Sequence, residues 1–117
     1  MAFQTYKDLV VWQKSVELVI ATYKLTEKFP KSELFGLVSQ MRRCSVSVPS
    51  NIAEGWRRRG EKEYRRFLLI AYGSGSELET QIEISKQLAF VENINYDLVD
   101  GLLNEVMRML NKMINQK

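Results

Sequence analysis

Arginine side chains gather in one stretch of this sequence, residues 39–60, which reads SQMRRCSVSVPSNIAEGWRRRG. The stretch contains Pro49 and closes on the consecutive arginines Arg57, Arg58 and Arg59. Because unpaired charge is costly to remove from water, these guanidinium groups must face solvent, an anion or another subunit. The chemistry that this pattern predicts is therefore anion binding, with phosphate or carboxylate oxygens as the partners.

The net charge of +3 is unevenly distributed along the chain. Between Met41 and Arg66, eight lysines and arginines stand against three glutamates, so this window carries +5 and the remainder carries −2. Such asymmetry indicates a surface for a polyanion or for an acidic partner protein. The candidate nucleic-acid-binding residues are Arg42, Arg43, Arg57, Arg58, Arg59, Lys62, Arg65 and Arg66.

Local ion pairing is the competing explanation for part of this basic window. Acids three or four residues away on a helix neutralise arginines, and cations in a last helical turn also complement the helix dipole. The predicted pairs are Glu54 with Arg58, Glu61 with Arg65, and Glu63 with Arg66. For Arg42 and Arg43, ion pairs with acids of another helix are as consistent with the pattern as ligand contact. The acids considered are Glu54, Glu77, Glu79 and Glu83.

Catalytic chemistry has little to build on in this sequence. It contains no histidine, which removes the usual general base at neutral pH and the commonest zinc ligand. Cys44 lies among apolar neighbours and is predicted to be a buried, inert thiol in a reducing cytoplasm. Glu77, Glu79 and Glu83 are interpreted as a solvated acidic face, or as the counterpart of the arginines on a neighbouring subunit. We therefore expect no catalytic residues, no metal and no cofactor.

The length of 117 residues predicts one domain, residues 1–117. No apolar run approaches the roughly 20 residues of a membrane span. The N-terminus lacks a basic start, a long apolar core and a small-residue cleavage site, so it does not read as a signal peptide. These features favour a cytoplasmic protein that does not bind membranes.

Hydrophobic periodicity predicts an all-α protein. Four helical segments are expected, over about 6–28, from Ser32 to the arginines before Gly60, over about 61–90, and from about Asn95 onward. Long helices with short joints favour an up-down-up-down four-helix bundle. Pro49 is expected to kink the second helix without ending it, and the third helix to continue through the GSGS sequence at residues 73–76.

The first helical segment carries two apolar stripes, where a four-helix bundle needs only one per helix. The main stripe is Leu9, Trp12, Val16, Val19, Ile20 and Tyr23, and the second is Val11, Leu18 and Leu25. We therefore expect this helix to be buried on two sides, which favours self-association. From the second helix, the residues expected in the core are Leu34, Val38, Met41, Ser45, Val48, Ile52 and Trp56. The third helix has a seam at Tyr64, Leu68, Ala71, Gly75, Leu78, Ile82, Ser85 and Ala89, and the last helix carries Val99, Leu102, Leu103, Val106, Leu110 and Met113.

The chain resembles the bacterial family of small four-helix-bundle proteins first met as open reading frames within intervening sequences of 23S ribosomal RNA genes. The matching stretches are DLVVWQKSVEL (8–18), FPKSELFGLVSQMRRCSVSVPSNIAEG (29–55) and YRRFLLIAYGSGSELETQIEIS (64–85). The run PSNIAEG at residues 49–55 is the most specific part. Cys44 and Ser45 stand where two small residues such as alanines are expected, and Gly60 stands in place of a serine.

This resemblance implies a four-helix bundle that assembles as a ring-like homopentamer. A related branch, the accessory variability determinant of diversity-generating retroelements, is similar in fold and is a basic pentameric barrel that binds nucleic acid and a reverse transcriptase. The ribosomal label sometimes given to the family rests on gene location and implies no activity. The sequence thus predicts a non-enzymatic homo-oligomer that contacts RNA or DNA phosphates without sequence specificity. The alternative is a scaffold whose arginines bind an acidic partner protein.

Overall fold

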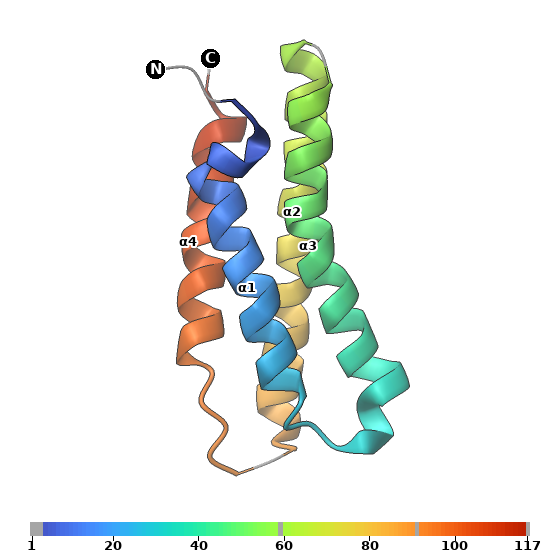
Figure 1. Cartoon of the computed structure of the whole chain (residues 1–117). Coiled ribbons are helices and arrows are strands. Elements are labelled where there is room, and N and C mark those ends of the chain that lie inside the picture. The colour runs from blue at the N-terminus through green and yellow to red at the C-terminus, as the bar shows by residue number, and fades with distance from the viewer. Residues whose placement is uncertain (1–3, 59, 91, 117) are drawn as a thin grey trace.

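A computed structural model describes residues 4–58, 60–90 and 92–116, which form an up-down-up-down bundle of four α-helices (Figure 1). The helices are α1 (Val10–Thr26), α2 (Ser39–Arg57), α3 (Glu61–Leu88) and α4 (Asp97–Ile114). Each helix packs against its neighbours in the chain, and α4 returns to α1. The pairs α1–α2 and α3–α4 therefore form opposite sides of the bundle. The predicted all-α fold is confirmed.

The long axis of the bundle follows α3. At about 1.5 Å per residue, the 28 residues of α3 span about 42 Å, close to the 46 Å length of the molecule. No helix of the described residues is both long and apolar enough to cross a membrane.

Within one copy, α1 buries the second of its two predicted apolar stripes. Its buried positions are Val11, Ser15, Leu18, Ala21, Thr22, Leu25 and Thr26, which include the second predicted stripe. The main predicted stripe begins on the buried Leu9, outside the helix, but within α1 its residues are half-buried or exposed, with 52% exposed at Ile20 and 41% at Tyr23. Within a single copy, α1 is therefore buried on one side, and its other apolar side faces outward.

The second helix begins later than the sequence predicts. Two short segments precede it, a 3-10 turn η2 (Lys31–Glu33) and a π-helical turn η3 (Leu34–Val38). Glu33 caps this start, because its carboxylate accepts a hydrogen bond from the Leu37 amide. Leu34, predicted for the core, is 47% exposed. The irregular start of α2 therefore turns apolar side chains outward.

Pro49 lies inside α2 without ending it, as predicted. Proline removes one backbone donor from the helix. In the neighbouring turn, the Asn51 amide group donates to the Ser47 carbonyl at 2.8 Å and to the Ser47 hydroxyl at 3.0 Å. The same hydroxyl lies 2.8 Å from that of Ser74 on α3. A polar link between α2 and α3 thus lies beside the proline.

The GSGS sequence continues α3 as predicted, and its two glycines have different surroundings. A Cβ on residue 75 would collide with the Met107 sulfur on α4, so Gly75 allows close helix approach. A Cβ on residue 73 would meet nothing within 4 Å.

We expect Gly73→Ala to stabilise the protein by about 0.4–1 kcal/mol, because alanine has the higher helix propensity and the site has room for its methyl group. Urea unfolding at fixed protein concentration measures this difference. A destabilised Gly73→Ala variant would contradict the open environment of this residue.

Candidate nucleic-acid interface

The end of the bundle where α2 passes into α3 carries most of the predicted basic residues. We call Arg57, Arg58, Lys62, Arg65 and Arg66 the basic tip. In Figure 1 this hairpin extends beyond the adjacent ends of α1 and α4. Arg59, also predicted for this site, lies outside the described residues. The tip therefore presents five described cations on a projecting hairpin.

Gly55 lets α2 and α3 approach closely beneath the basic tip. A Cβ on residue 55 would lie 2.8 Å from the Phe67 Cβ and 3.3 Å from the Tyr64 carbonyl oxygen. Phe67 is buried, and its ring lies under two guanidinium groups, at 5.2 Å from Arg58 and 4.6 Å from Arg66. One aromatic ring thus positions arginines from both helices by cation–π contact.

Two of the predicted local ion pairs are present. Arg58 contacts the Glu54 carboxylate at 2.9 Å, and Arg66 contacts Glu63 at 3.1 Å. The hydrogen bond from Arg66 lowers the pKa of the Glu63 carboxyl. These arginines therefore carry their own counter-charges, and they contribute less to an external anion than free arginines would.

The third predicted pair is wrong, because Arg65 turns toward α4 rather than toward Glu61. Its Nε donates to the Ile114 carbonyl at 2.9 Å, at the end of α4. Cations favour helix C-termini, where backbone carbonyls have no helical partner. Arg65 therefore ties the hairpin to the last turn of α4 while remaining exposed.

Arg57, Lys62 and Arg65 are the exposed cations of the basic tip that form no ion pair within the described part of the chain, and Arg65 is held by the Ile114 carbonyl. The Arg57 guanidinium lies 5.4 Å from the centre of the Tyr6 ring, in the short segment η1 (Tyr6–Asp8). An arginine on an aromatic face keeps its N–H groups available for phosphate oxygens. The side chains of Arg57 and Lys62 are therefore the best placed to bind an anion from outside the protein.

Arg42 and Arg43 do not join the basic tip. They lie about fourteen residues before Arg57 on α2, which corresponds to about 20 Å along the helix. Arg42 donates to the Thr26 hydroxyl at 2.9 Å and stacks on the Tyr23 ring at 4.5 Å, so it links α2 to α1. The predicted partner acids from another helix are not its partners. Arg43 is exposed beside it.

Tyr6 and Phe67 are the site residues that the sequence pattern does not single out. The pattern predicts that Tyr6 begins the first helix, and Phe67 lies outside the predicted seam of α3. An aromatic residue adjacent to a basic run was the available signal, since Phe67 directly follows Arg66.

Cys44 is half-buried rather than fully buried. Burial raises the pKa of its thiol, so the nucleophilic thiolate is disfavoured at neutral pH. The Gln81 amide group donates to its sulfur at 3.4 Å. The environment of Cys44 is that of a structural thiol.

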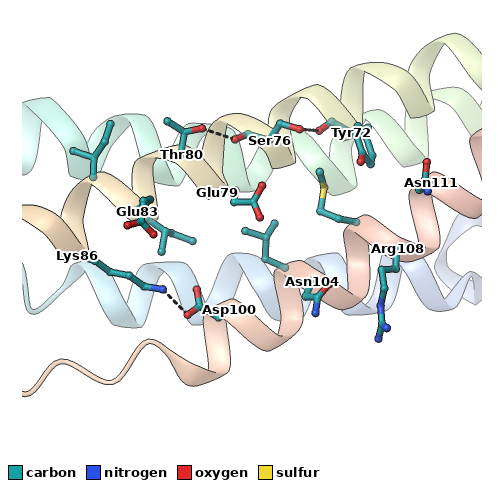
Figure 2. A pocket seen from close by; sticks show the side chains of 14 residues that line it. Tyr72, Ser76, Glu79, Thr80, Glu83, Lys86, Asp100, Asn104, Arg108 and Asn111 are labelled. Carbon is teal, nitrogen blue, oxygen red and sulfur yellow. Dashed lines mark hydrogen bonds and ion pairs between the residues drawn. The ribbon is translucent and has the colours of Figure 1, made fainter.

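A groove of about 930 Å³ runs between α3 and α4 (Figure 2). We call it the α3–α4 groove. Among the described residues, no three acidic or cysteine side chains converge as a metal site requires. The residues that line it are Tyr72, Ser76, Glu79, Thr80, Ile82, Glu83, Ile84, Lys86, Asp100, Leu103, Asn104, Met107, Arg108 and Asn111.

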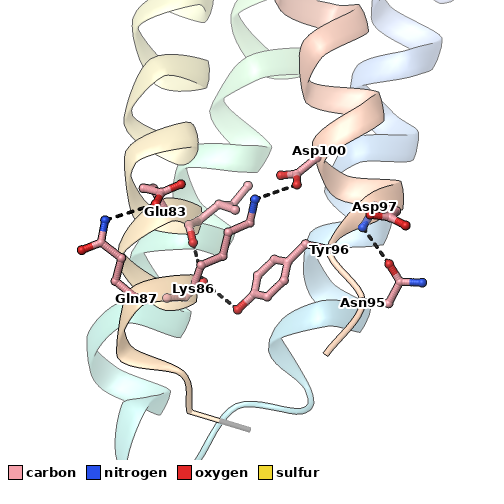
Figure 3. Close-up of polar contacts among 9 residues, drawn as sticks. Glu83, Lys86, Gln87, Asn95, Tyr96, Asp97 and Asp100 are labelled. Carbon is pink, nitrogen blue, oxygen red and sulfur yellow. Dashed lines mark hydrogen bonds and ion pairs between the residues drawn. The ribbon is translucent and has the colours of Figure 1, made fainter. Parts of the chain in front are cut away.

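An ion pair joins α3 to α4 at one end of this groove (Figure 3). The Lys86 ammonium lies 2.7 Å from the Asp100 carboxylate and 5.3 Å from the centre of the Tyr96 ring. The hydrogen bond to Asp100 raises the pKa of Lys86. The Tyr96 hydroxyl lies 3.0 Å from that of Ser85.

We expect Lys86→Met to lower the free energy of unfolding by at most about 1 kcal/mol at pH 7, since both partners are partly solvated. A raised lysine pKa stabilises the fold below the pKa of unfolded lysine, about 10.4, and that contribution is lost as pH rises through the folded value. Urea unfolding of both proteins at pH 7 and above pH 11 measures the difference. An undiminished difference at high pH would mean that packing, rather than charge, is responsible.

Comparison with known proteins identifies a matching family and a solved structure with a similar fold. A family model described as 23S rRNA-intervening sequence protein matches residues 7–112. The fold is similar to that of a protein of unknown function from the S23 ribosomal protein family of Bacteroides thetaiotaomicron VPI-5482, with a TM-score of 0.80. The match has 22% sequence identity and covers 92% of this chain and 100% of the other, so it supports the fold alone. No curated protein matches the chain.

Proposed function

The chain belongs to the family of 23S rRNA-intervening sequence proteins, and on that basis we propose that it is a non-enzymatic, self-associating protein that contacts RNA or DNA phosphates without sequence specificity. The proposed assembly is a homopentamer, the number that the family resemblance implies, and the proposed setting is the cytoplasm. The observation that carries the proposal is the basic tip, with Arg57 and Lys62 exposed and not ion-paired within the described residues.

Phosphate is the ligand that best matches the chemistry of the tip. Arginine presents a planar fork of N–H donors to phosphate oxygens, and contacts to the backbone of a nucleic acid carry no sequence information. One tip is a small site, because Glu54 and Glu63 already neutralise part of its charge. Several tips on one assembly would produce a collective positive field, which is why self-association belongs to the proposal.

Support for self-association comes from the apolar side of α1 that a single copy leaves outside. Ile20 and Tyr23 are exposed there, and Val19 lines the same shallow surface. Exposed large apolar side chains that form a contiguous surface are typical of an interaction site.

A gel-shift titration at low salt tests the proposed ligand. The probes are a structured RNA, a single-stranded RNA and a DNA duplex. We expect all three to be bound with similar affinity, and the affinity to fall steeply as salt is raised. Absence of binding to every probe at low salt would refute the proposed nucleic-acid contact.

An acidic partner protein is the second candidate for the basic tip. The observation that favours it is that Arg58 and Arg66 already bind carboxylates, so the site suits carboxylate as well as phosphate. Affinity capture with and without nuclease treatment separates the two candidates. Partners that stay bound after nuclease treatment, and that an Arg57→Ala/Lys62→Ala variant no longer captures, would favour the acidic protein.

A further inference from the structure

Two opposite sides of the bundle carry surfaces of different shape. On the α1–α2 side, Phe35 is 93% exposed and borders a shallow hollow with the exposed Tyr23 and Leu34, and the exposed Ile20 lies next to Tyr23. We call these four residues the apolar knob. In Figure 1 the segment before α2 projects sideways from the bundle at the end opposite the termini. On the α3–α4 side lies the α3–α4 groove, whose apolar lining includes Ile82, Ile84, Leu103 and Met107.

The two surfaces also differ in charge. Arg42 and Arg43 line the hollow that Phe35 and Tyr23 border, and Lys24 lies next to Tyr23 on the same side. In the α3–α4 groove, Glu79, Glu83 and Arg108 lie among the lining side chains (Figure 2), and Lys86 is paired with Asp100. Glu27 lies on the same surface as Lys24, so the charges next to the apolar knob are three positive and one negative. In the groove, two negative charges, Glu79 and Glu83, stand against Arg108 once Lys86 and Asp100 are paired, so the two surfaces have opposite net charge.

The two surfaces lie at similar levels along the long axis of the bundle. Cys44 on α2 contacts Gln81 on α3, and the two helices are antiparallel. Residues before Cys44 therefore lie level with residues after Gln81, which places Phe35 about 9 Å, or less than two helical turns, from the level of Ile84. Arg43 lies level with Glu79 and Glu83 by the same register. When two copies are related by a rotation about an axis parallel to the bundle, each residue keeps its level along that axis. The apolar knob of one copy can then face the groove of the next.

We propose that the α3–α4 groove receives the apolar knob of a second copy of this chain, with Arg43 against Glu79 and Glu83. This inference rests on the self-association in the proposed function and adds its direction and residues. Because the knob and the groove are on opposite sides, the contact is head-to-tail, and each copy keeps one surface free for the next. Such a contact generates a closed ring or an open filament rather than an isolated dimer.

Two variants that each disable one surface test this contact. Phe35→Asp places a carboxylate on the knob and leaves the groove intact, and Ile84→Arg blocks the groove and leaves the knob intact. Both positions are exposed, Phe35 at 93% and Ile84 at 44%, so the bundle should fold in each variant. Helical circular dichroism and thermal unfolding check the fold. The matched control is Val10→Asp, which changes an exposed apolar residue of α1 that belongs to neither surface.

Sedimentation velocity reads out the result. Each variant alone should be monomeric, with self-association weakened about 30-fold or more, as expected for a central interface residue. Their mixture should form a 1:1 dimer, because the knob of one variant fits the groove of the other. Val10→Asp should assemble like the wild type.

Three outcomes would overturn the inference. If Phe35→Asp assembles like the wild type, or the mixture stays monomeric, the knob–groove contact is wrong although self-association stands. If the wild type itself is monomeric, the proposed assembly and this contact fall together, while the gel-shift result on nucleic acid remains a separate measurement.

Discussion

Replacing Arg57 and Lys62 by alanine is expected to weaken nucleic-acid binding about tenfold or more at low salt. These two cations have no ion pair within the described residues and, unlike Arg65, are not held by the end of α4, so their removal takes away charge that is available to an external anion. Each lost phosphate contact should also reduce the slope of log affinity against log salt by about 1. The loss should be the same for all sequences, because phosphate contacts do not distinguish bases.

A matched control removes the same charge from the other end of the bundle. Lys28→Ala/Lys31→Ala changes two exposed lysines that lie between α1 and η3. If binding depends on the basic tip, this control should retain nearly the wild-type salt slope and affinity. Equal losses in the two double variants would mean that net charge, and not the tip, governs binding. The larger variant Arg57→Ala/Arg58→Ala/Arg59→Ala should reduce binding in the same direction as Arg57→Ala/Lys62→Ala.

Gly55→Ala is expected to destabilise the protein by about 1–2 kcal/mol. The added methyl group would lie 2.8 Å from the Phe67 Cβ, and neither that atom nor the Tyr64 backbone can move without shifting α3. Overpacking of this kind costs about 1–3 kcal/mol, and the higher helix propensity of alanine offsets up to about 1 kcal/mol of it. Thermal unfolding at fixed protein concentration should show a midpoint lower by about 4–8 °C.

The same substitution should disturb the basic tip, because Phe67 lies under both Arg58 and Arg66. Nucleic-acid affinity of Gly55→Ala should therefore fall even at temperatures where the variant is folded. Gly73→Ala is the matched control, since it makes the same chemical change in a helix with open space around it. A Gly55→Ala variant as stable as Gly73→Ala would contradict the close helix contact described here.

Periodicity predicted the core of α3 and α4 well. The seam through Leu68, Gly75 and Ile82 is buried as expected, because alternating spacings of three and four fix one face of a long helix. For α1, periodicity predicted two apolar stripes but did not decide which of them the bundle buries. Thr22 is fully buried there, since its hydroxyl donates to the Leu18 carbonyl at 2.8 Å. A pattern of hydrophobic residues does not reveal that a polar side chain can be buried when its hydrogen bond is made within its own helix.

The basic tip was predictable in the parts that are local in sequence. The pairs Glu54–Arg58 and Glu63–Arg66 follow from helical spacing and are present. Contacts between distant segments were not predictable in this way. Arg65 binds the carbonyl of Ile114, 49 residues away, because the end of α4 lies beside the start of α3 in the folded bundle. The contact of Arg57 with Tyr6 likewise depends on where η1 packs.

The central claim is that copies of this chain join and pool their basic tips, and the solution mass at micromolar concentration tests it most directly. Sedimentation velocity of the wild-type protein should give a particle several times the 13.7 kDa of one chain. A stable particle of 13.7 kDa at that concentration would contradict the account.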